Sequence, residues 1–276
     1  MPSLRETRYA VRRALAASRC LPLALNVYES VRKWSPELAP RNARLRRAAP
    51  DSNPLPPSGL VFAVACTRDL DYFLQSGAAA AQAIRSALAS VGRPVETFEA
   101  VLDFGCGCGR VLRHFADLPA GRLHGCDYDA AAIAWMERHA PFARVALNGL
   151  RPPLPYASGA FDLVYALSVF THLPVDLQRA WMAELRRVLR PGGVLVLTTM
   201  GERFAARLTA AEQDAFRSGE LVVRDGRLAG TNACAAYHPE RWVRDRLAVG
   251  FRVLGFRPAG AVGNAGQDLY VLEREA

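Results

Sequence analysis

The stretch VLDFGCGCGR at residues 101–110 decides which fold the sequence predicts. A short apolar run ends at Asp103, three glycines follow on alternate positions, and an apolar periodicity resumes at Val111. That order is typical of a buried strand, a tight turn and a helix. Glycines at this spacing allow positive φ angles, and the start of the expected helix offers unpaired N–H groups. The turn therefore predicts a site for a small polar ligand.

The spacing of the glycines and the acidic residue before them discriminate between ligands. Dinucleotide sites use G-x-G-x-x-G, whereas this turn has G-x-G-x-G. Asp103 would repel a pyrophosphate and attract an ammonium group. The next expected strand ends in Asp127, where an acid commonly accepts hydrogen bonds from ribose hydroxyls. A ribose and an amino-acid ammonium in one ligand point to S-adenosylmethionine.

With these residues the chain resembles the class I S-adenosylmethionine-dependent methyltransferases, from Val101 to the C-terminus. The resemblance implies an α/β fold with a doubly wound, mostly parallel seven-stranded sheet, an antiparallel last strand, helices on both faces and a helical N-terminal extension. The matching segments are the first motif with Asp103, Gly105, Gly107 and Gly109, the ribose acid Asp127, the fourth strand Phe161–Ala166, and Arg187–Gly193 before the fifth strand.

The resemblance also implies which residues hold the cofactor. Asn148 ends the third expected strand, where the family often has an acidic or amide side chain that reads the adenine amino edge. Tyr72, at the start of an expected helix, is a candidate contact for the methionine end, with ordinary helix packing as the alternative. The predicted cofactor-binding residues are Asp103, Gly105, Cys106, Gly107, Gly109, Asp127, Tyr128, Asn148, Gly149, Leu150, Leu167 and Tyr72.

One histidine is the candidate for catalysis. His172 follows the fourth strand at the carboxyl edge of the sheet, where open α/β folds bind ligands. Its imidazole could take the proton of an acceptor hydroxyl. Alternatively, His172 bonds a backbone carbonyl and shapes the pocket, with His238 as the competing base. No metal is expected, because no carboxylate and histidine cluster with ligand spacing lies outside the cofactor motifs.

The positive charge of the chain is concentrated at one end. The 276 residues carry a net charge of +9, and residues 1–50 contain eleven basic and three acidic residues, which leaves +1 for residues 51–276. We expect residues 1–58 to form a basic helical arm and a Pro-rich linker, and residues 59–276 to form the methyltransferase domain. The arm is expected to pack on the domain, with contact to a membrane surface or a partner as the alternative.

Composition also excludes several classes of protein. No apolar run approaches the ~18 residues of a membrane span, and no secretory signal pattern is present. Six cysteines without zinc-site spacing favour free thiols in the cytoplasm. The nearly neutral core argues against nucleic acid as the acceptor. So does LSVF at residues 167–170, where amino-methylating enzymes carry an N/D-P-P-Y/F motif.

We therefore expect methyl transfer from S-adenosylmethionine to a hydroxyl or amine of a small molecule. A nicotinamide-dependent oxidoreductase and a non-catalytic S-adenosylmethionine-binding scaffold are the alternatives, and the oligomeric state is not predicted. Acceptor selectivity should lie in the arm, the insert at residues 200–237 and the loop at 258–266.

Further expected elements are helices over 69–91, 129–139 and 240–249, a helix that opens at Pro174, a hairpin or turn at Asp225–Gly226, and strands over 143–147, 251–256 and 267–272.

Overall fold

Seven strands form one sheet in the order β3-β2-β1-β4-β5-β9-β8 in a computed structural model, which describes residues 37–50 and 53–276. Neighbours from β3 to β5 are parallel, and β9 is antiparallel to both β5 and β8. The predicted doubly wound sheet with an antiparallel last strand is confirmed. The strands are Val101–Phe104 (β1), Leu123–Asp127 (β2), Arg144–Leu147 (β3), Phe161–Ala166 (β4), Leu189–Thr199 (β5), Phe251–Ala261 (β8) and Gln267–Arg274 (β9).

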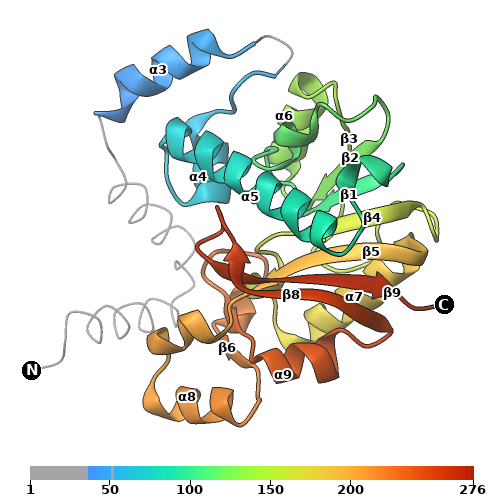
Figure 1. Cartoon of the computed structure of the whole chain (residues 1–276). Coiled ribbons are helices and arrows are strands. Elements are labelled where there is room, and N and C mark those ends of the chain that lie inside the picture. Colours follow the sequence, from blue (N-terminus) through green and yellow to red (C-terminus); the bar gives the residue numbers. More distant parts are fainter. Residues whose placement is uncertain (1–36, 51–52) are drawn as a thin grey trace, which may run out of the picture.

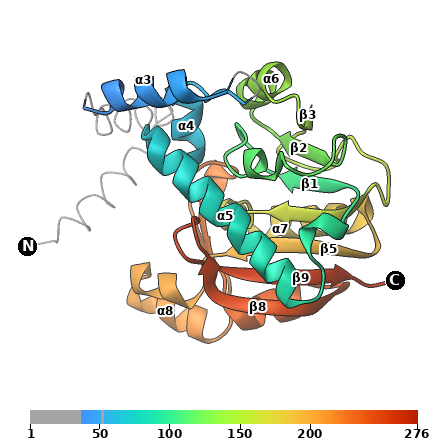
Figure 2. The same ribbon diagram turned by 45° about the horizontal axis from the view of Figure 1, so that its top comes forward.

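Helices cover both faces of this sheet, because alternate residues of its central strands are buried on opposite sides. Leu163 and Tyr165 of β4 pack with α5 (Leu70–Ser90) and α6 (Ala130–His139), whereas Val164 and Ala166 pack with α7 (Val175–Val188). Figure 1 and Figure 2 show α5 lying across one face of the sheet. The helices predicted over residues 69–91 and 129–139 are both present, and the side chains of Asp69 and Asp129 cap α5 and α6.

The prediction of a helix directly after the glycine turn is wrong. The chain instead forms one short 3-10 helix, Leu112–Phe115 (η2), after several residues of turn. Leu112 and Phe115 are fully buried, so the apolar periodicity reports core contacts and not an α-helix. Pro119 ends the segment soon afterwards, because a proline disfavours helical backbone in the residue before it. A piece this short supplies no appreciable helix dipole to the turn.

The region after β5 differs from the prediction in two details. The helix expected over residues 240–249 begins as α9 (Glu240–Trp242) and continues as a π-helix over Val243–Leu247. The strands β6 (Val222–Arg224) and β7 (Ala235–Tyr237) pair as an antiparallel hairpin, but residues 225–234 connect them in place of a tight turn. Within this connection Asp225 has a φ of +51° and precedes the 3-10 helix Gly226–Leu228 (η5). The insert also contains η4 (Glu202–Arg207) and α8 (Ala210–Arg217).

The strand β8 carries irregularities that the pattern of residues 251–256 did not predict. Its pairing with β9 shifts register between Val253 and Gly255 and again between Arg257 and Ala261. At these points the two strands no longer match residue for residue, which is how β-bulges arise. The strand extends to Ala261, five residues beyond the predicted end.

In the described part of the chain, α3 (Leu38–Ala48) and α4 (Ser58–Ala65) precede α5. The helix predicted over residues 3–19 lies outside the described residues. An apolar stripe is predicted at Leu23, Val27, Val31, Trp34 and Leu38, and of these only Leu38, the first residue of α3, is described. Within the described residues, no helix combines the length and the apolar character that a bilayer crossing requires.

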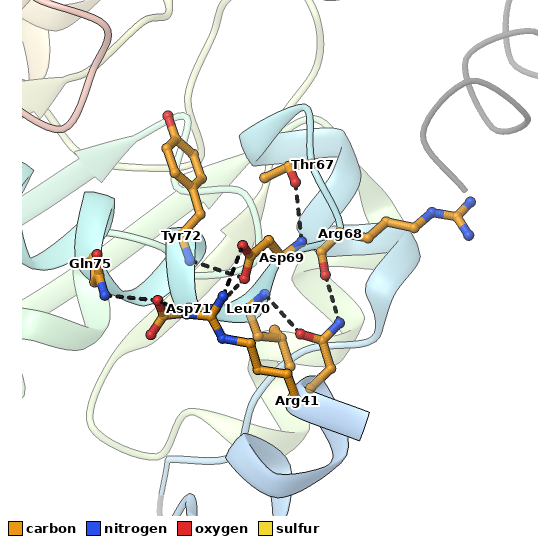
Figure 3. Close-up of polar contacts among 9 residues, drawn as sticks. Arg41, Thr67, Arg68, Asp69, Leu70, Asp71, Tyr72 and Gln75 are labelled. Carbon is orange, nitrogen blue, oxygen red and sulfur yellow. Dashed lines mark hydrogen bonds and ion pairs between the residues drawn. The ribbon is translucent and has the colours of Figure 1, made fainter. Parts of the chain in front are cut away.

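The helix α3 supplies part of the N-terminal cap of α5. The buried Asn42 accepts a hydrogen bond from the backbone N–H of Leu70 at 3.1 Å and donates one to the carbonyl of Arg68 at 2.8 Å. Beside it, the exposed Arg41 pairs with Asp71, as Figure 3 shows. The first N–H groups of a helix have no partner within it, so Asn42 satisfies a donor that would otherwise be buried without one.

We expect Asn42→Ala to lower the free energy of unfolding by about 1–3 kcal/mol, because it leaves a buried N–H and a buried carbonyl without partners. Arg41→Ala is the matched control, since it removes an exposed ion pair from the same helix, and such pairs contribute about 1 kcal/mol or less. Urea denaturation followed by circular dichroism measures both. Equal effects of the two substitutions would contradict the capping role.

Candidate functional site

A cavity of about 200 Å³ lies at the carboxyl ends of β1, β2, β3 and β4. Its wall comes from the glycine turn after β1 and from the segments that follow β2, β3 and β4. Of the thirteen residues predicted for the site, all but Gly109 and Tyr72 line this cavity. The topology therefore brings together side chains that lie up to about 70 residues apart in the chain.

The glycine turn allows three other segments to approach the backbone closely. Gly105 and Gly107 have φ angles of +81° and +52°. A Cβ on Gly105 would lie 2.5 Å from Val169 after β4, and one on Gly107 would lie 2.5 Å from Val64 of α4. A Cβ on Gly109 would lie 2.7 Å from the sulfur of Met136, which explains why Gly109 packs on α6 and does not line the cavity. The turn is therefore a cradle that side chains at these positions would fill.

Two carboxyl groups are buried beside the turn. Burial raises the pKa of Asp103 to about 8, although the hydroxyl of Tyr165 and the charge of Arg110 act in the opposite direction. Burial also raises the pKa of Asp127, while hydrogen bonds from backbone N–H groups lower it. Asp127 accepts from Gly107 N through Oδ2 and from Asp129 N through Oδ1, both at 2.8 Å. Negative charge here is costly without a cation, so the cavity suits a positively charged ligand.

Asn148 presents an acceptor that has no partner. Its Nδ2 donates to the carbonyl of Gly149 at 2.7 Å. Its Oδ1 is buried and has no hydrogen-bond partner among the described residues, and Asn148 lines the cavity. A buried oxygen without a partner costs free energy, which an amino group of a ligand would recover. The orphaned oxygen fits the amino edge of an adenine.

His172 lines the same cavity from the 3-10 helix Phe170–His172 (η3). Its Nδ1 lies 2.8 Å from the carbonyl oxygen of Cys234, so Nδ1 carries the hydrogen and Nε2 keeps its lone pair. Burial lowers the pKa of His172, so the ring is neutral at pH 7. Both expectations for this residue, a bond to a backbone carbonyl and a ring free to accept a proton, are compatible with this geometry.

The competing histidine does not reach the cavity. His238 is fully buried, its Nε2 lies 3.1 Å from Gln178 Oε1, and burial lowers its pKa to about 3. It therefore joins the insert to α7 as a neutral packing residue. Tyr72 also lies off the wall: its side chain is 48% exposed, and in Figure 3 its ring extends away from the Arg41–Asp71 pair.

Several lining residues were not predicted from the sequence. They include Ala63 and Val64 of α4, Gly230 and Asn232 of the insert, and Trp181 of α7. The apolar run Leu60–Ala65 after the Pro-rich segment was a signal for α4, and the insert was expected to bear on selectivity without named residues. In the part of the chain that the structure describes, no group of three His, Cys, Asp or Glu side chains is arranged to hold a metal.

Comparison with known proteins identifies the family. Residues 101–193 match the family of the methyltransferase domain, which spans the glycine turn, both buried acids and the segment with His172. Residues 101–193 are thus a methyltransferase domain, and a relative named as a probable S-adenosylmethionine-dependent methyltransferase matches part of the chain. The cofactor of this family is S-adenosylmethionine, and the cradle of glycines and the orphaned oxygen of Asn148 fit it.

Relatives of this methyltransferase differ in what their names say they modify. A malonyl-[acyl-carrier protein] O-methyltransferase of Enterobacter lignolyticus is 37% identical over 121 residues, 42% of this chain and 45% of the relative. A ribosomal protein L11 methyltransferase of Ralstonia nicotianae is 31% identical over 158 residues, 57% of this chain and 51% of the relative. The chain thus spans about half the length of these curated relatives.

The fold of the methyltransferase also has a solved counterpart. DesVI of Streptomyces venezuelae superposes with a TM-score of 0.52 at 19% identity, covering 75% of this chain and 96% of that one. At this identity the likeness shows the fold alone, so the acceptor has to be argued from the site.

We expect S-adenosylhomocysteine, which carries the same amino-acid ammonium group as the cofactor, to release protons when it binds near pH 7. Asp103 has a pKa of about 8 and is largely protonated at that pH. A cation beside it favours the ionised form, so its pKa falls and a proton leaves. Titration calorimetry in buffers of different ionisation enthalpy counts the protons.

Asp103→Asn is the matched control, because the amide has the same size and does not titrate in this range. Asp127 remains in both proteins, so its contribution cancels in the comparison. If both proteins released the same number of protons, Asp103 would not face the ammonium group.

Proposed function

We propose that the chain transfers a methyl group from S-adenosylmethionine to a hydroxyl, or an amine, of a small molecule. The observation that carries this proposal is the arrangement around one cavity of a glycine cradle, two buried carboxyl groups and the imidazole of His172. The nearly neutral charge of residues 51–276 supports an acceptor other than nucleic acid.

The lining residues divide between the parts of the cofactor. Asp103 would pair with the methionine ammonium, Asp127 would accept from the ribose hydroxyls, and the free Oδ1 of Asn148 would accept from the adenine amino group. Tyr128, Gly149, Leu150 and Leu167 would contribute contact surface along the same wall. When bound, the cofactor supplies a methyl group on a positively charged sulfur. Much of the rate enhancement would then come from alignment in the cavity, which can contribute ~7–11 kcal/mol.

His172 would act as the general base for a hydroxyl acceptor. The acceptor oxygen would form its bond to the methyl carbon as the methyl–sulfur bond breaks and S-adenosylhomocysteine leaves, and the hydroxyl proton would pass to Nε2 of His172. The hydrogen bond from Nδ1 to Cys234 supports this role, because it leaves Nε2 as the ring acceptor. An amine acceptor that is already neutral would need the base only after transfer.

Two further expectations remain part of this proposal. Residues 1–58 would form an arm and a linker, and residues 59–276 would form the methyltransferase domain. Within the arm, Asn42 of α3 forms hydrogen bonds to the start of α5. The cytoplasm is the proposed compartment, supported by the four buried free thiols of Cys106, Cys108, Cys126 and Cys234. A basic arm that contacts a membrane surface or a partner remains the alternative to one packed on the domain.

We expect Asp127→Ala to weaken binding of S-adenosylhomocysteine at least about tenfold, because hydrogen bonds to a charged group contribute about 1.5–3 kcal/mol each. Titration calorimetry measures the affinity, and circular dichroism checks that the variant is folded. The same titrations with NAD test the oxidoreductase alternative. Tighter binding of NAD than of S-adenosylhomocysteine by the unaltered protein would overturn the proposed function.

We expect His172→Asn to lower turnover by ~10²–10⁴-fold with nearly unchanged affinity for S-adenosylhomocysteine, since the amide keeps a donor but is no base. In the unaltered protein, the acidic limb of the rate profile should fall below pH 6.5, because burial lowers the pKa of His172 from that value. A screen of candidate acceptors by mass, for the gain of a CH₂ group, provides the assay. Equal losses of turnover and of cofactor affinity would make His172 a wall residue only, and absence of turnover with every acceptor would favour the scaffold alternative.

A further inference from the structure

A short segment of the insert covers the cavity on the adenine side. Gly230 has a φ of +81°, and a Cβ on it would lie 2.7 Å from Leu150 and 3.4 Å from the ring of Tyr128. The hydroxyl of Tyr128 donates a hydrogen bond to the carbonyl of Gly230 at 2.7 Å. Because residue 230 has no side chain, the backbone of the insert rests directly on two residues of the wall. We call residues 230–234 the roof segment.

The roof segment also reaches the helix that covers the other side of the cavity. Val64 of α4 lies against Gly107 of the glycine turn, so α4 covers the turn. Asn232 donates a hydrogen bond through Nδ2 to the carbonyl of Ala63 in α4 at 3.0 Å. Both Asn232 and Ala63 line the cavity. This hydrogen bond therefore joins the roof segment to α4 over the cavity.

The same five residues hold the proposed base. The backbone N–H of Gly230 donates to the carbonyl of His172 at 2.8 Å. The ring of His172 donates from Nδ1 to the carbonyl of Cys234, also at 2.8 Å. Cys234 is fully buried, so in this arrangement its carbonyl is shielded from water. The tautomer of His172 thus depends on a carbonyl that belongs to the cover of the cavity and not to the central sheet.

We propose that the roof segment couples closure of the cavity to the orientation of His172, with Asn232 as a positioning residue. The inference rests on the proposed function, because it assigns the segment a part in that reaction. When the roof segment moves away from α4, the Cys234 carbonyl moves with it and Nδ1 of His172 loses its partner. The ring then exchanges between its two neutral tautomers, and Nε2 is no longer a constant proton acceptor. Proton abstraction is therefore confined to the closed cavity.

Asn232→Asp tests this coupling. The carboxylate has the size of the amide but cannot donate to the carbonyl of Ala63, so closure is weakened without removal of a side chain. We expect S-adenosylhomocysteine to dissociate about two- to tenfold faster, which corresponds to the loss of one hydrogen bond. Stopped-flow displacement measures this rate. Glu220→Gln is the control, because Glu220 is an exposed residue of the same insert, away from the cavity, and it should leave the rate unchanged.

The decisive measurement is the tautomer of His172. The chain has five histidines, so the ring nitrogens of a protein labelled with ¹⁵N-histidine can be resolved by NMR, and His172→Asn assigns the signal. In the unaltered protein with S-adenosylhomocysteine, we expect the Nδ1–H form of His172. In Asn232→Asp the Nε2–H form should gain population. The fold decrease in kcat should be larger than the fold change in KM. Asn232→Gln, which restores an amide donor, should recover part of both effects.

The possible outcomes separate the inference from the proposed function. Faster dissociation with an unchanged His172 signal would overturn the coupling, and so would unchanged dissociation together with an unchanged signal. A tautomer change in Asn232→Asp, in a protein that transfers no methyl group to any acceptor, would leave the coupling intact and overturn the proposed function.

Discussion

The hydrogen bond from the backbone N–H of Gly107 to the carboxylate of Asp127 is the contact on which the site depends. It joins the turn after β1 to the end of β2, and the parallel register of these strands brings the two groups to the same edge. The turn can follow this path only with glycine at positions of positive φ, since Val64 and Val169 occupy the space of a side chain. Strand order, cavity and cover therefore all rest on one arrangement of backbone and acid.

The sequence predicted the sheet because its signals are local. Asp103 and the glycines mark the first crossover. Apart from Asp162, Phe161–Ala166 contains apolar and aromatic residues, and all six residues are buried. The prediction of helices fails where buried residues have the spacing of an α-helix but the chain forms none. Leu112 and Phe115 have the spacing of an α-helix, yet they reach the core from a 3-10 turn. Tertiary contacts determine the backbone conformation of this segment, and the spacing of apolar residues alone carries no information about those contacts.

The candidate site was predictable where side chains carry the chemistry. Acids, amides and the imidazole at strand ends can be read from the sequence, and those residues line the cavity. The cover over it was not predicted, because its partners are main-chain carbonyls of Ala63, Gly230 and Cys234. Every residue type has a carbonyl, so a contact to one leaves no signature in the sequence. Tyr72 shows the converse, an aromatic residue at a suggestive position whose side chain is exposed.

The register shifts of β8 have a consequence for how copies of the chain meet. β8 lies at one edge of the seven-stranded sheet and β3 lies at the other. An edge strand offers unpaired N–H and carbonyl groups to the edge of another molecule, which is a route to aggregation. The bulges beside Gly255 and between Arg257 and Ala261 break the regular spacing of those groups. The other edge, β3, has four residues only. Neither edge is therefore a good template for adding a strand, so the protein is protected against sheet-to-sheet growth at both ends.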